Sequence, residues 1–211
     1  TRGGGLNQFV RERGEFIRFT GDAAHPRDLV SPPITALAED RAGRLWIGTS
    51  WDGVRIWDRA SGDYIILKHD SQNPDTIADD NVTSILKDAS GVIWIGTTRG
   101  GINKSLADLV KFSHFKRSRQ DSLGLSRNNV RSLRKGDGGR LWVGFDEGLD
   151  EIDEQTGLVR RFHHDPSASA SLGPGAVLAV LEDKQGRVWV GLEDGGLDCI
   201  NRRTGRITHY R

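Results

Sequence analysis

Apolar and polar residues alternate over short stretches of the chain with the two-residue period of β-strands. Such alternation occurs at residues 34–39, 82–87, 130–135 and 177–182. Each of these stretches precedes a second apolar string, which contains a tryptophan and ends in glycine. Because no window sustains the 3.6-residue apolar period of an amphipathic helix, the pattern predicts an all-β fold.

The tryptophan string recurs about every 48 residues along the chain. Its fixed positions are Trp46, Trp94, Trp142 and Trp189, together with Gly48, Gly96, Gly144 and Gly191. An Asp-x-x-Gly segment precedes the first, second and fourth strings, whereas Gly136 stands in the aspartate position before the third. Aspartate and glycine at this spacing are typical of a β-turn that closes a hairpin. We expect the tryptophan rings to fill the space between sheets and the glycines to let neighbouring backbones approach closely.

A second glycine-containing turn follows in most copies, so each unit is expected to hold four short antiparallel strands. Four strands in a unit of this length match a β-propeller blade. The predicted blades are residues 34–69, 82–117, 130–164 and 177–211, and residues 1–20 align with the last two strands of a blade. The sequence therefore predicts one β-propeller segment over residues 1–211, with four complete four-stranded antiparallel blades plus half a blade.

The predicted segment begins inside a blade, at Thr1, and contains no methionine. We therefore expect a piece of a longer protein with two uncovered sheet faces. The remaining blades of the parent, or a second copy of the segment, would cover these faces.

Charge and composition exclude several classes of partner. Lys and Arg number 30 against 29 Asp and Glu, so no overall field attracts the chain to nucleic acid or to an anionic membrane surface. The apolar runs are far shorter than the ~18 to 20 residues of a membrane span. A single cysteine, Cys199, cannot form an internal disulfide. We expect neither nucleic-acid binding nor membrane contact within this segment.

The repeated residues carry a family resemblance. The pattern Asp-x-x-Gly-x-Leu/Ile/Val-Trp-Ile/Val-Gly is followed by Gly-Gly-Leu/Ile-Asn/Asp, and the link after the third unit contains His164-Asp165-Pro166 and Ser171-Leu172. Together these motifs resemble the two-component regulator propeller repeat over essentially the whole chain. The resemblance implies an extracytoplasmic, periplasmic sensor propeller of a bacterial membrane receptor. In such receptors an immunoglobulin-like domain, a membrane helix and a histidine kinase or diguanylate cyclase output follow, and several relatives sense oligosaccharides.

Positions that differ between the blades are the candidates for ligand binding. We expect the loops between the second and third strands to emerge on the same face as the links between blades. The candidate residues in these loops are Trp51, Asp52, Arg99, Asp146, Glu147, Glu193 and Asp194. An additional tryptophan beside carboxylates and an arginine is a composition that stacks on and hydrogen-bonds a sugar, or anchors a peptide. The alternative is that Trp51 packs against a neighbouring loop while the charges are solvated.

The sequence does not identify a catalytic or metal centre. His163 and His164 are consecutive strand residues, so they point to opposite faces and cannot easily bind one ion. The loop carboxylates could form an acid and base pair or bind calcium, but no spacing fixes the distances between them. We therefore expect no catalytic residue, no metal and no cofactor.

The leading hypothesis is a non-catalytic, ligand-sensing segment of a two-component-type receptor that binds an oligosaccharide or another small ligand at its loop face. One alternative is a protein–protein interaction scaffold without a small ligand. The other is a propeller enzyme that resembles the streptogramin-inactivating lyases and uses an arginine or histidine and a metal at the channel mouth.

Overall fold

A computed structural model describes residues 5–19, 32–106, 111–117 and 124–211. Within these ranges the chain forms strands β1 to β18 in five antiparallel sheets, and no helix. Residues 1–4 and 20 of the predicted half blade lie outside the described ranges. The prediction of an all-β propeller with four four-stranded sheets and a two-stranded unit is confirmed.

The two-stranded unit and the first two four-stranded sheets, named blades 1 and 2, occupy the first half of the chain. The hairpin consists of β1 (Leu6–Val10) and β2 (Glu15–Phe19). Blade 1 consists of β3 (Ile34–Glu39), β4 (Leu45–Thr49), β5 (Val54–Trp57) and β6 (Tyr64–Leu67). Blade 2 consists of β7 (Val82–Lys87), β8 (Val92–Thr97), β9 (Ile102–Leu106) and β10 (Ser113–Phe115).

The second half of the chain forms blades 3 and 4. Blade 3 consists of β11 (Val130–Gly136), β12 (Arg140–Phe145), β13 (Leu149–Asp153) and β14 (Val159–Phe162). Blade 4 consists of β15 (Val177–Glu182), β16 (Arg187–Leu192), β17 (Gly196–Asn201) and β18 (Ile207–Tyr210). In every blade the strands pair in chain order, so each blade is a meander.

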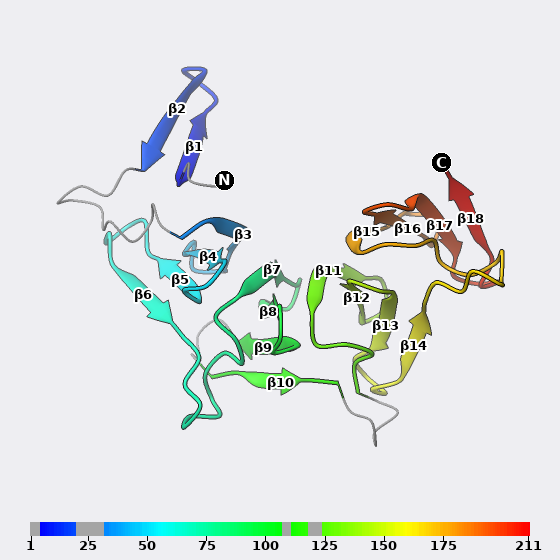
Figure 1. Ribbon diagram of the computed structural model, residues 1–211. Coiled ribbons are helices and arrows are strands. Elements are labelled where there is room, and N and C mark those ends of the chain that lie inside the picture. The colour runs from blue at the N-terminus through cyan, green and yellow to red at the C-terminus, as the bar shows by residue number, and fades with distance from the viewer. Residues whose placement is uncertain (1–4, 20–31, 107–110, 118–123) are drawn as a thin grey trace.

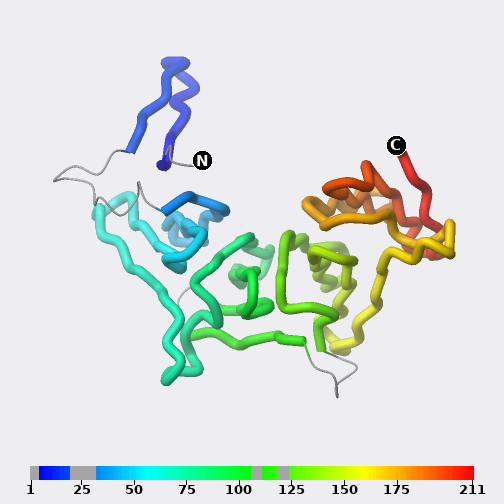
Figure 2. Tube along the Cα trace, viewed as in Figure 1, coloured from blue at the N-terminus to red at the C-terminus, as the bar shows by residue number. Residues whose placement is uncertain are grey.

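The blades follow one another along an open arc (Figures 1 and 2). The first strand of each blade lies on the inner side of the arc, and β6, β10, β14 and β18 lie toward the outside (Figure 1). The β1–β2 hairpin and blade 4 stand on the two sides of the opening (Figure 2). This radial order of the strands is that of a propeller.

The core is divided into layers between successive blades. Trp46 packs with Val82 and Ile93 of blade 2, and Trp94 packs with Val130 and Leu141 of blade 3. Trp142 packs in the same way with Val177 and Val188 of blade 4. These three rings are at most 2% exposed, so the prediction that they fill the space between sheets is confirmed.

The glycine at the end of each tryptophan string makes room for the next blade. A Cβ atom on Gly48, Gly96 or Gly144 would lie within 2.6 Å of the valine that begins the next blade. A Cβ atom on Gly191 would meet only Ala179 of its own blade, at 3.6 Å. In the described part of the chain, blade 4 therefore has one face on which no further sheet packs.

The aspartate before the first, second and fourth strings anchors the tryptophan of that string. Trp46 Nε1 donates a hydrogen bond to Asp40 Oδ2 at 2.9 Å, and Trp94 Nε1 donates to Asp88 Oδ2 at 3.0 Å. Burial alone would raise the pKa of Asp40, but the hydrogen bonds from Trp46 and Arg44 outweigh burial and lower the pKa. The aspartate is therefore both a turn residue and the acceptor for the indole N–H.

Blade 3 replaces this anchor with a carboxylate from its neighbour. Gly136 cannot accept a side-chain hydrogen bond, and Trp142 Nε1 donates instead to Oε2 of Glu182 at 3.2 Å. Glu182 belongs to β15 of blade 4, and its other oxygen pairs with Arg202 Nη1 at 2.6 Å. A Cβ atom on residue 136 would lie 2.2 Å from Glu182 Oε2. The departure from the repeat at Gly136 is therefore compensated across the interface between blades.

Candidate ligand-binding face

The loops between the second and third strands of the blades share a face with the links that precede each blade. Backbone hydrogen bonds join Ser50 N to Pro33 O at 3.1 Å, Thr98 N to Asn81 O at 3.0 Å and Glu193 N to Ala176 O at 2.9 Å. A further bond joins Gly53 N of blade 1 to the link before blade 2, at Asp80 O and 3.0 Å. The predicted loop face is thus tied together by backbone contacts within and between blades.

A polar residue in the third strand fixes each link to its blade in blades 2, 3 and 4. Asn103 Oδ1 accepts a hydrogen bond from Ala78 N at 2.7 Å, and Asp150 Oδ2 accepts one from Ser126 N at 2.8 Å. Asp198 Oδ2 accepts one from Gly173 N at 2.7 Å. All three side chains are buried, and burial raises the pKa of Asp150. The sequence motif Gly-Gly-Leu/Ile-Asn/Asp contains these residues, but their anchoring role was not predicted.

Blade 1 departs from this arrangement. Arg55 occupies the position of the anchoring Asn or Asp and forms an ion pair with Asp52 at 2.5 Å. Lys68 forms a second ion pair with the same carboxylate. Asp52, one of the predicted ligand-binding residues, therefore already has two cationic partners within the protein.

Threonine side chains shape the loops of blades 1 and 2. Thr49 Oγ1 donates to Gly53 O at 2.8 Å and accepts from Asp52 N at 3.1 Å. Thr97 forms the same pair of bonds with Gly101 O and Gly100 N, at 2.9 and 3.1 Å. In blades 3 and 4 the corresponding residues are the buried Phe145 and Leu192, which have no hydroxyl to form these bonds. Only in blades 1 and 2, therefore, does a threonine hydroxyl brace the loop.

The two loops braced by threonine carry Trp51 and Arg99. Trp51 is 61% exposed, so most of its surface is not packed against another loop. Arg99 is exposed, and its backbone N donates to Asp79 Oδ2 at 2.7 Å. In the described ranges, no carboxylate forms an ion pair with the Arg99 guanidinium. Both side chains are available to solvent on the loop face.

The remaining candidates fall into two groups. Asp146 bonds to Asn129 and Arg131, and Glu147 pairs with Arg127 at 2.5 Å. Glu193 and Asp194 are exposed. Within the described residues, no hydrogen bond or ion pair joins one of the seven predicted site residues to another. The structure therefore places them on one face without assembling them into a preformed cluster.

No group of three or more His, Cys, Asp or Glu side chains is arranged to hold a metal ion in the described part of the chain. His164 contacts the backbone instead, with Nδ1 at 2.8 Å from Leu172 O. Across the same residues, no helix has the length and apolar character needed to span a bilayer.

The fold and the loop face define the class of protein: a β-propeller segment whose variable loops gather on one side. Residues 28–51, 76–99 and 171–194 match the two component regulator propeller family. These three segments therefore carry repeats of the two component regulator propeller family, and the resemblance stated from the sequence is confirmed for them. No curated protein matches the chain significantly in sequence.

Solved structures share the fold. The chain is similar to the extracellular domain assigned to the hybrid two component system BT3049 of B. thetaiotaomicron, with 23% identity and a TM-score of 0.74 over 84% of this chain and 24% of that one. It is equally similar to the extracellular domain assigned to the one component system BT4673 of B. thetaiotaomicron, with 23% identity and a TM-score of 0.73 over 99% and 28%. The chain thus spans about a quarter of each of these domains.

A lyase with a propeller fold is a more distant relative in sequence. Virginiamycin B lyase from Staphylococcus aureus is 12% identical, with a TM-score of 0.68 over 99% of this chain and 63% of that one. Identity at this level reflects the shared fold, and fold alone does not imply a shared reaction.

Proposed function

We propose that the chain is a non-catalytic, ligand-sensing segment of an extracytoplasmic, periplasmic receptor of the two-component type. The regulator propeller repeats and the similar extracellular domains assigned to signalling systems support this proposal. In it, the loop face contacts an oligosaccharide or another small polar ligand through Trp51 and Arg99. Ligand binding across blades would shift their packing, and an output domain would respond to that shift.

The observation that carries the proposal is the exposure of Trp51. The tryptophans of the first three strings are at most 2% exposed, whereas Trp51 is 61% exposed and lies outside the repeat. A large aromatic side chain with most of its surface exposed is suited to stacking on a sugar ring. Arg99, in the corresponding loop of the next blade, supplies hydrogen-bond donors for hydroxyl or carboxylate groups.

The predicted carboxylates take different parts in the proposal. Asp52, Asp146 and Glu147 are neutralised by cationic side chains, so they position loops and are secondary contacts. Glu193 and Asp194 are exposed and would act as peripheral acceptors for ligand hydroxyl groups.

The test is a thermal-shift screen followed by calorimetric titration with neutral and uronic-acid-containing oligosaccharides. A ligand that binds only the folded state raises the melting temperature. We expect Trp51→Ala and Arg99→Ala each to weaken binding about tenfold or more, as loss of an interface anchor does. Leu158→Ala and Arg203→Ala are matched controls, because both residues are exposed in turns on the opposite side of the blades. A sugar whose affinity is unchanged in both loop variants would exclude this site.

A protein-interaction surface is the second candidate function, favoured by the uncovered face of blade 4. Leu181 is 49% exposed and Leu197 is 38% exposed there, while Trp189 is only half-buried. We propose that a further sheet of the same kind, from the remainder of a longer parent or from a second copy, covers this face. Sedimentation of the wild type and Leu181→Lys over a concentration series tests self-association. Concentration-dependent dimers that are lost in the variant support the second copy, and a monomer at all concentrations excludes it.

A further inference from the structure

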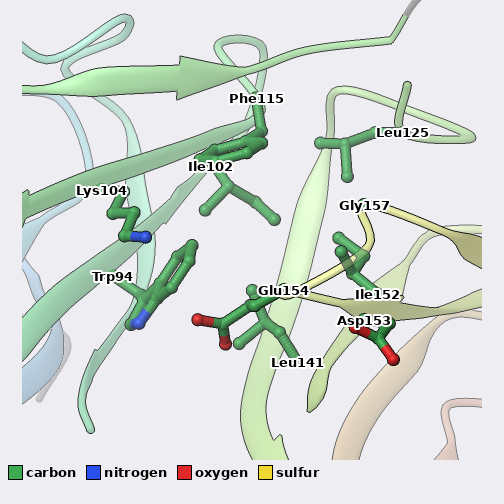
Figure 3. Close-up of a pocket in the computed structure, with 10 residues that line it drawn as sticks. All are labelled: Trp94, Ile102, Lys104, Phe115, Leu125, Leu141, Ile152, Asp153, Glu154 and Gly157. Carbon is green, nitrogen blue, oxygen red and sulfur yellow. The ribbon is translucent and has the colours of Figure 1, made fainter. Parts of the chain in front are cut away.

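A cavity of about 280 Å³ lies between blades 2 and 3 (Figure 3). Its apolar lining comes from both blades and from the link between them: Trp94, Ile102, Phe115, Leu125, Leu141 and Ile152. The turn between β13 and β14 closes one side, through Gly157. Because β13 runs away from the loop face, this turn and the cavity lie toward the opposite side of the blades. The cavity is therefore separate from the site around Trp51.

The cavity exists because two side chains are shorter here than at the neighbouring interfaces. Phe112 fills the layer between blades 1 and 2, whereas the corresponding residue between blades 2 and 3 is the smaller Val159. Arg160 lies over the ring of Phe162 at 4.8 Å, whereas Ser113 occupies the equivalent position beside Phe115. Phe115 is accordingly 39% exposed, so an aromatic surface is open at the cavity.

Two lysines lie over the Trp94 ring at the edge of this apolar space: Lys104, and Lys135, whose Nζ is 5.5 Å from the ring centre and pairs with Asp88 and Glu154. Lys104 Nζ lies 4.8 Å from the centre of the Trp94 ring, and Figure 3 shows the two side chains side by side. No carboxylate in the described ranges pairs with Lys104. Of the nearby acids, Glu154 is paired with Lys135. Asp153 accepts hydrogen bonds within its own turn, from Gln155 N and Thr156 N at 2.9 and 3.0 Å. The ammonium of Lys104 is thus the charge that a ligand could neutralise.

We propose that this cavity binds a small monocarboxylate with a single aromatic or branched apolar group. The carboxylate would pair with Lys104, and the apolar group would lie among Trp94, Phe115 and Ile152. The volume equals that of about nine water molecules at ~30 Å³ each, which matches a ligand of about ten non-hydrogen atoms. This site is independent of the function proposed for the loop face.

The experiment is calorimetric titration of the 211-residue protein with phenylacetate, and with phenylacetamide as the uncharged analogue of the same shape. We expect phenylacetate to bind with a Kd of about 1 mM or tighter, and phenylacetamide to bind about tenfold more weakly. Lys104→Gln should reduce phenylacetate affinity to that of the amide. Lys184→Gln removes the same charge from an exposed site in blade 4 and should leave binding unchanged.

A second variant tests the cavity itself. Ile152→Phe adds volume to the lining and should abolish binding of both compounds, and its melting temperature reports whether the blades still pack. Three results would overturn the proposal. The first is no phenylacetate binding at a ligand concentration tenfold above the expected Kd of about 1 mM. The others are equal affinity for phenylacetate and phenylacetamide, and unchanged phenylacetate affinity in Lys104→Gln. None of these results depends on whether the loop face binds an oligosaccharide.

Discussion

In blade 3, Glu182 of blade 4 takes the place of the aspartate that accepts the indole hydrogen bond. This predicts that substitutions at positions 136 and 182 are strongly coupled in their effects on the free energy of unfolding. Glu182→Ala removes the acceptor of the Trp142 indole, which is 0% exposed, and the partner of Arg202. A hydrogen bond to a charged acceptor contributes ~1.5 to 3 kcal/mol, and an unpaired buried donor adds a further penalty. Arg202 retains Glu151 at 3.4 Å, which limits the loss from the ion pair. We therefore expect Glu182→Ala to lower the free energy of unfolding by about 2 to 4 kcal/mol.

The reciprocal substitution tests whether Glu182 acts as this anchor. Gly136→Asp in the wild type places a Cβ atom 2.2 Å from Glu182 Oε2 and 2.7 Å from Trp142 Nε1. The overlap, and the second carboxylate beside Glu182, should destabilise the protein by about 2 to 4 kcal/mol. In the Glu182→Ala background the overlap with the Glu182 carboxylate is gone, the indole of Trp142 remains 2.7 Å from the Cβ position, and the aspartate supplies the acceptor used in blades 1, 2 and 4. There we expect Gly136→Asp to destabilise the protein by at least about 2 kcal/mol less than it does in the wild type.

Equilibrium unfolding in urea, followed by tryptophan fluorescence and circular dichroism, measures the four proteins of this cycle. The expected coupling free energy is at least about 2 kcal/mol. Glu182→Gln is the control, because its amide oxygen can still accept from the indole, and it should cost only about 1 kcal/mol. Additive effects of the two substitutions, within about 0.5 kcal/mol, would refute the compensation.

Three further predictions concern matched positions in different blades. Ser132 Oγ donates to Val177 O at 2.9 Å, whereas Ser84 Oγ is buried without a partner in the described residues. In urea unfolding, Ser132→Ala should therefore lower the free energy of unfolding by about 1 kcal/mol, and Ser84→Ala should leave it unchanged. Gly144→Ala should cost about 2 kcal/mol or more because its Cβ would meet Ser132 and Val177, whereas Gly191→Ala should be tolerated in the same assay. The hydrogen bond from Trp189 lowers the pKa of Asp183 to about 2, so its stabilisation is complete above about pH 4 and is lost as the pH falls toward 2. Asp183→Asn should therefore flatten the acid limb of a stability profile, and an unchanged limb would contradict this reasoning.

The period of the sequence predicts the strands well because each blade repeats the same local chemistry. The alternating stretches 34–39, 82–87 and 177–182 coincide with β3, β7 and β15. Strand β11 extends one residue further than the predicted 130–135, to Gly136. At that position a turn-forming aspartate is missing, so the local signal for the strand end is weaker.

Features that depend on contacts between blades could not be predicted from the repeat. The Trp142 indole finds its acceptor on Glu182, which lies 40 residues away in the sequence. The ion pairs of Asp146 with Arg131 and of Glu147 with Arg127 depend on how a loop meets the start of β11 and the link before it. The sequence can place these charged residues in loops or strands, but only the packed structure shows which of them are in contact.

Differences between the blades thus fall into two physical classes. Inside the blades, a departure from the repeat is balanced by another side chain, as when Glu182 serves for the missing aspartate or Arg55 pairs with Asp52. Such pairs restore the hydrogen bonds and charge balance that a buried layer needs. On the loop face, Trp51 differs from its counterparts and is 61% exposed, so burial does not account for its presence. The exposed part of this large apolar ring gains nothing from folding, and contact with a ligand or partner is the role that would give it a favourable environment.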